Sequence, residues 1–89
     1  MSRADIIRQR LEAELSPLQL RITDNSANHA GHSGARTEGE THFRIEIVAR
    51  KFTDMRPLDR HRLINKVLVD LFEQGLHALE IKAKSPEEL

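Results

Sequence analysis

The stretch Arg60–Pro86, RHRLINKVLVDLFEQGLHALEIKAKSP, decides the fold because it reads as a helix followed by a strand. Its first part places apolar residues at helical spacing, and together they form one broad stripe: Leu63, Ile64, Val67, Leu68, Leu71 and Phe72. Gly75 follows this stripe and predicts the left-handed end of a helix. From His77 to Lys84, apolar and polar residues alternate, which predicts a strand with one buried face.

His77 opens this predicted strand and falls on the same face as Leu79 and Ile81. We therefore expect its imidazole at the rim of the core. The spacing leaves two interpretations open. His77 is either a hydrogen-bonded histidine at the edge of the core or a ligand in a metal site.

The composition predicts one small soluble domain. The chain has 89 residues, of which 38% are apolar and 31% charged, enough for a two-layer core but not for an enclosed catalytic cavity. The formal net charge of zero argues against strong non-specific affinity for nucleic acids. The absence of cysteine excludes disulfides and any site built from the chain's own thiolates. Without a signal-like or membrane-spanning apolar run, we expect a cytoplasmic protein with no membrane partner.

The order of the predicted elements indicates an α+β fold. Residues 2–5 have the S-x-x-D form of a helix start, and Ser16-Pro17 should end that helix. Residues 18–23 and 42–51 both alternate as strands. The α-β-β-α-β order predicts a single two-layer domain over residues 1–89, with a three-stranded mixed sheet and both helices on one face.

A long polar segment separates the first two predicted strands. Residues 24–41, DNSANHAGHSGARTEGET, contain no large apolar side chain and predict an exposed loop. His29 and His32 lie in it, either as ordinary polar residues or as part of a site. A zinc site on the pair is the weaker alternative, because structural zinc requires four closely held ligands. The acidic tail, residues 85–89, is expected to fray.

Four short segments, in this order and spacing, resemble the BolA family: Thr41-His42-Phe43, Arg60-His61-Arg62, Leu76-His77-Ala78-Leu79 and Ser85-Pro86. The resemblance covers nearly the whole chain and implies a BolA-like fold, similar to the second type of KH domain. The chain departs from the family pattern at Asp54, where glycine is usual, and at Leu89, where many members have an aromatic residue.

The resemblance also implies a function. BolA-like proteins are small partners of monothiol glutaredoxins and share a bridging 2Fe–2S cluster with them. Members are linked to iron–sulfur cluster maturation and transfer and to iron regulation, and some to transcriptional control and cell shape. The isolated chain would then hold no cofactor and would be a monomer or a weak dimer.

The family's cluster ligands map onto two places in this sequence. The histidine that opens the last strand corresponds to His77, and the loop ligand corresponds to His29, with His32 as the substitute. A glutaredoxin cysteine and glutathione would supply the thiolates that this chain lacks. Such an arrangement, with two imidazoles, is similar to the Rieske type.

The alternative function is that of a KH-like DNA-binding regulator of transcription. Its candidate phosphate contacts cluster near the start of the second predicted helix: Arg56, Arg60, Arg62 and Lys66. The same residues are also typical of a solvated helix face that pairs with Asp59 and Glu73, or of a docking surface for an acidic partner. We do not expect an enzyme, because no serine or histidine falls in a nucleophile–base pattern.

Overall fold

The computed structural model describes residues 2–25 and 41–89 and confirms the α+β class. The chain runs through these elements in order: α1 (Arg3–Leu15), β1 (Gln19–Asp24), β2 (His42–Val48), η2 (Arg50–Phe52), α2 (Pro57–Val67), α3 (Val69–Glu73), β3 (Ala78–Lys84) and η3 (Pro86–Glu88). The labels η2 and η3 denote short 3-10 helices. None of the helices among the described residues has the length and apolarity to span a membrane.

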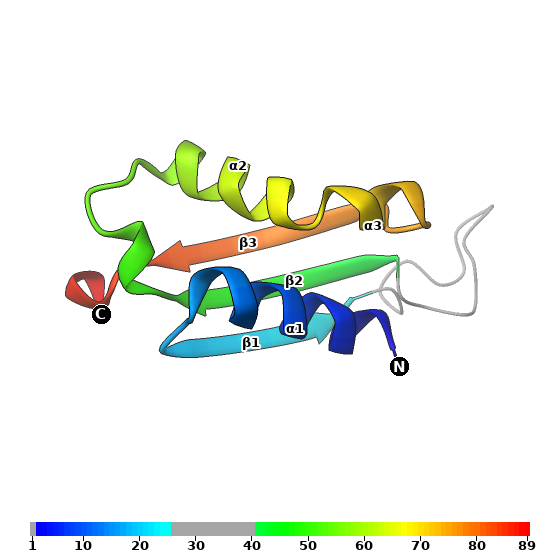
Figure 1. The fold of residues 1–89 in the computed structure, drawn as a ribbon, viewed down its shortest axis with the longest axis horizontal. Helices are drawn as coiled ribbons and strands as arrows, with labels where there is room; N and C mark the ends of the chain where they lie inside the picture. The colour runs from blue at the N-terminus through cyan, green and yellow to red at the C-terminus, as the bar shows by residue number, and fades with distance from the viewer. Residues whose placement is uncertain (1, 26–40) are drawn as a thin grey trace.

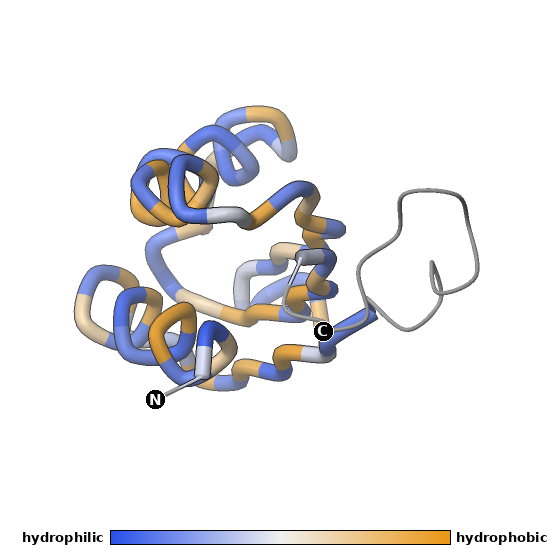
Figure 2. The backbone as a smooth tube through the Cα atoms, turned by 90° about the vertical axis from the view of Figure 1, so that its right-hand side faces the viewer, coloured by the Kyte–Doolittle hydropathy of each residue, from blue (hydrophilic) through white to orange (hydrophobic). Residues whose placement is uncertain are grey.

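The predicted mixed sheet is confirmed. Strand β2 lies in the centre, antiparallel to β1 and parallel to β3. Helices α1, α2 and α3 cover one face of the sheet (Figures 1 and 2). Since β1 runs against β2 while β3 runs with it, the end of β1 and the starts of β2 and β3 meet at one end of the sheet (Figure 1).

The core lies between this face and the helices. Alternate residues of β2 point into it, and α1 contributes one residue per turn, as the apolar pattern predicts. The central cluster of buried apolar side chains consists of Ile7, Leu11, Leu15, Phe43, Ile45, Ile47, Ala49, Phe52, Ile64, Leu68, Leu71 and Leu76.

Both ends of α1 form as the sequence predicts. Ser2 Oγ accepts a hydrogen bond from the Asp5 amide at 3.2 Å, and the Asp5 carboxylate accepts one from the Ser2 amide at 3.2 Å. This capping box satisfies two amides that the first turn leaves without helical partners. At the other end, Ser16 adopts a left-handed conformation with φ 44° and ends the helix.

The second predicted helix is divided in two. Leu68, with φ −106° and ψ 12°, interrupts the helix between α2 and α3, although the apolar stripe continues across it. Its side chain is fully buried, as are those of Ile64 and Leu71, whereas Phe72 at the end of the predicted stripe is exposed. Gly75 has φ 113°, which confirms the predicted left-handed residue after the helix. There the Arg3 guanidinium donates to the Gln74 carbonyl at 2.8 Å.

The backbone conformation at Asp54 explains why glycine is usual at this position in the family pattern. Asp54 follows η2 with φ 66°, a conformation that glycine adopts without a steric cost. We therefore expect Asp54→Gly to raise the free energy of unfolding by about 0.5–1 kcal/mol. Urea unfolding measures this change. Asp54→Ala is the matched control, since alanine keeps the steric cost of the left-handed conformation, and equal effects of the two substitutions would contradict the prediction.

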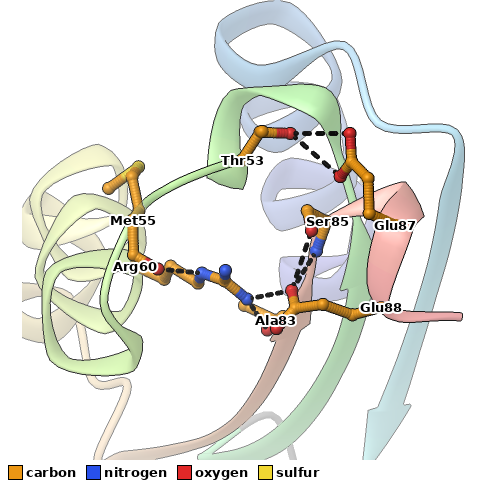
Figure 3. Close-up of polar contacts among 7 residues, drawn as sticks. All are labelled: Thr53, Met55, Arg60, Ala83, Ser85, Glu87 and Glu88. Atoms are coloured by element: carbon orange, nitrogen blue, oxygen red, sulfur yellow. Dashed lines mark hydrogen bonds and ion pairs between the residues drawn. The ribbon is translucent and has the colours of Figure 1, made fainter.

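The predicted fraying of the tail is wrong. Residues Ser85–Glu88 form a capped turn, η3, and Ser85 is buried. Glu88 Oε1 accepts hydrogen bonds from the Ser85 amide at 2.7 Å and the Ser85 hydroxyl at 2.9 Å (Figure 3). The Arg60 guanidinium donates to the same oxygen at 2.5 Å, and Thr53 Oγ1 donates to Glu87 at 3.2 Å. The acidic tail is therefore held both by its own Ser85 and by two donors from earlier in the chain, Arg60 and Thr53.

These donors should make stability depend on pH. The Ser85 amide, the Arg60 guanidinium and the Ser85 hydroxyl hold the pKa of Glu88 at about 2, below its ordinary value of 4.5. Because folding lowers this pKa, the ionised carboxylate stabilises the fold above about pH 4.5, and that contribution is lost as the pH falls toward 2. We expect Glu88→Gln to weaken this pH dependence in urea unfolding. The exposed Glu12→Gln should leave it unchanged, and the same slope in Glu88→Gln would contradict the assignment.

Candidate functional site

The end of the sheet where the three strands meet carries the candidate site. We call it the histidine corner and define it as Asn25, Thr41, His42, His77 and Ala78. The Thr41 carbonyl accepts hydrogen bonds from the amides of His77 at 2.8 Å and Ala78 at 3.2 Å. The His42 carbonyl accepts one from the Asn25 amide at 2.7 Å. These bonds fix the backbone of three segments that are distant in sequence.

Two imidazole rings meet at this corner. The ring centroids of His42 and His77 are 5.8 Å apart, and the ring planes make an angle of 80°. Nδ1 of His42 lies 2.9 Å from the Thr41 hydroxyl, within hydrogen-bonding distance. The parallel register that pairs His42 with Ala78 places both histidines at the starts of neighbouring strands.

His77 lies one residue before β3, and its side chain is exposed. Within the described part of the chain its ring makes no hydrogen bond, and its one ring contact is with His42. The exposure of the side chain argues against a histidine packed at the edge of the core. An exposed imidazole on a fixed backbone is instead available to a second molecule.

The loop histidines His29 and His32 lie outside the described residues, so their prediction as ligands stays a prediction. The two residues that flank the undescribed segment, Asn25 and Thr41, both belong to the histidine corner. Among the described residues no group of three or more His, Cys, Asp or Glu side chains forms a metal site.

The predicted basic face of the second helix needs a correction. Arg60 is only 6% exposed, and its guanidinium lies inside the fold. Nε donates to the Met55 carbonyl at 2.9 Å, and Nη1 donates to the Ala83 carbonyl at 3.0 Å and to Glu88 (Figure 3). Arg60 therefore belongs neither to a solvated face nor to a phosphate-binding surface. The other three candidates, Arg56, Arg62 and Lys66, are exposed.

Known proteins share both the sequence pattern and the fold of this chain. A model of the family described as BolA-like protein matches residues 11–88. The chain belongs to the BolA-like family. The structure of the BolA domain of SufE1 from Arabidopsis thaliana superposes with a TM-score of 0.90 at 46% identity, covering 100% of this chain and 98% of that domain.

Two curated relatives of this BolA-like chain are longer proteins from Arabidopsis thaliana. Protein BOLA1, chloroplastic, is 45% identical over 89 residues, which cover 98% of this chain and 56% of the relative. SufE-like protein 1, chloroplastic/mitochondrial, is 46% identical over 92 residues, which cover 99% of this chain and 25% of the relative. The chain thus spans about half or less of the length of these relatives. Because their names refer to organelles, the cytoplasmic location stays a prediction.

His42 is the residue of the site that the sequence interpretation missed. The sequence marks it only as part of a family segment and as the first residue of a predicted strand. The predicted topology of the sheet is sufficient to identify His42. Two strands that are parallel neighbours and each begin at a histidine must bring those histidines to the same end of the sheet.

Proposed function

We propose that this BolA-like chain binds a monothiol glutaredoxin and supplies imidazole ligands to a 2Fe–2S cluster that the two proteins share. The cluster would serve iron–sulfur maturation and transfer or iron regulation. The observation that carries the proposal is the exposed His77 imidazole, held on a fixed strand end beside both flanks of the predicted loop. The name of the relative SufE-like protein 1 supports a role related to iron–sulfur clusters.

The donor set of the chain fits a shared cluster. The chain has no cysteine, so it offers nitrogen rather than sulfur to iron. A 2Fe–2S centre accepts two imidazoles in place of two thiolates when the remaining ligands are sulfur, and its reduction potential is then higher. The partner's cysteine and glutathione would provide that sulfur, and the two proteins would be joined by the cluster they ligate.

The second imidazole would come from the loop. His29 is four residues from Asn25, a span of at most about 14 Å of extended chain. His32 is seven residues from Asn25, a span of at most about 25 Å. Since the Asn25 amide is hydrogen-bonded to the His42 carbonyl, both spans start at the histidine corner, next to His77 in the site.

Reconstitution tests the proposed function. The chain is mixed with a monothiol glutaredoxin, iron, sulfide and glutathione, and visible absorption and circular dichroism are recorded. We expect a spectrum that differs from that of the cluster on the glutaredoxin alone, because imidazole replaces thiolate at one iron. Identical spectra with and without the BolA-like chain would overturn the proposal.

A further inference from the structure

The contact between His42 and His77 gives His42 a role that neither the family match nor the proposed function assigns. The two rings lie 5.8 Å apart at 80°, which is an edge-to-face arrangement. Aromatic pairs prefer this geometry because the positive edge of one ring meets the negative face of the other. The contact therefore favours one orientation of the His77 ring over others.

His42 is itself well anchored, as a supporting residue must be. It is the first residue of the central strand, and it is half-buried whereas His77 is exposed. Its Nδ1 lies 2.9 Å from the Thr41 hydroxyl, and its carbonyl accepts the Asn25 amide. The Thr41 carbonyl in turn binds the His77 amide, so the same dipeptide holds both the backbone and the ring of His77.

We propose that His42 is a positioning residue for His77, an inference that rests on the proposed function. An exposed histidine samples several staggered side-chain rotamers, and a metal ligand must give up this freedom when it binds. The perpendicular ring of His42 restricts His77 before the partner arrives. The imidazole is then presented in one orientation, and the complex with the partner's iron lasts longer.

The free protein provides a first test that needs no cluster. Three-bond couplings and nuclear Overhauser effects report the χ1 rotamer of His77 in wild type, His42→Ala and His42→Phe. We expect one dominant rotamer in wild type and averaging between rotamers in His42→Ala. His42→Phe retains an aromatic ring and should keep the dominant rotamer. A His77 rotamer distribution that is the same in wild type and His42→Ala would overturn the inference.

The mixed cluster provides a second test. We expect its circular dichroism signal to decay about tenfold faster with His42→Ala than with wild type, and at nearly the wild-type rate with His42→Phe. Equal decay in wild type and His42→Ala would overturn the positioning role. Equally fast decay in both variants would also overturn it, because a ring nitrogen rather than ring packing would then be required.

Failure of the proposed function can be told apart from failure of this inference. If wild type forms no mixed cluster, the proposed function fails, and the rotamers of His77 in the free protein still decide the role of His42. If the mixed cluster forms and is lost in His77→Ala but is unchanged in His42→Ala, the proposed function stands and the inference fails. Amide spectra of each variant show whether it is folded.

Discussion

Replacing His77 by alanine is expected to abolish the mixed cluster with a monothiol glutaredoxin and to leave the fold intact. In the proposed complex this residue supplies one iron ligand, and alanine offers no substitute. The His77 side chain is exposed, and its ring makes no hydrogen bond among the described residues, so the free energy of unfolding should change by less than about 0.5 kcal/mol. Circular dichroism of the reconstituted mixture measures the cluster, and urea unfolding measures stability.

His61 provides a matched histidine control. It lies on α2, away from the histidine corner, and His61→Ala should leave the mixed cluster unchanged. Separate His29→Ala and His32→Ala substitutions identify the loop ligand by the one that removes the signal. A mixed cluster that persists in His77→Ala with the wild-type spectrum would contradict the assignment of His77 as an iron ligand.

The sequence predicts most of the fold because local signals agree with the tertiary structure. The alternation in β2 places Phe43, Ile45 and Ile47 in the core, and the pattern at residues 2–5 forms a capping box. The mixed sheet follows from topology, since a strand that returns through a helix runs parallel to its neighbour. His77 is correctly placed at the strand start by the same alternation, although its side chain is exposed.

Most features that the sequence does not predict depend on contacts between distant segments. The helix break at Leu68 lies within an unbroken apolar stripe, so helical periodicity alone cannot locate it. The ordered conformation of the tail depends on Arg60, which precedes Glu88 by 28 residues. The contact of His42 with His77 depends on the register between β2 and β3. Patterns within one element carry no information about such pairs.

Replacing Arg60 by leucine is expected to lower the free energy of unfolding by about 3 kcal/mol. The substitution keeps an apolar stem but removes the donors to two backbone carbonyls, those of Met55 and Ala83, and to the Glu88 carboxylate. Leaving acceptors without a partner in a buried site costs more than the net value of the bonds themselves. The guanidinium also lies 5.9 Å from the centre of the Phe52 ring, and this contact would be lost. For a chain of 89 residues the loss corresponds to a decrease in melting temperature of roughly 12–24 °C, which calorimetry can measure.

Arg62→Leu is the matched control, because Arg62 lies on the same helix and is exposed. Its effect on the free energy of unfolding should stay within about 0.5 kcal/mol. Equal effects of the two substitutions would contradict the structural role of Arg60.

The buried position of Arg60 also affects how the DNA-binding alternative can be tested. Lost binding in an Arg60 variant would reflect a destabilised fold rather than a missing phosphate contact. A test of that alternative must therefore use the exposed cations Arg56, Arg62 and Lys66, whose removal leaves the core intact.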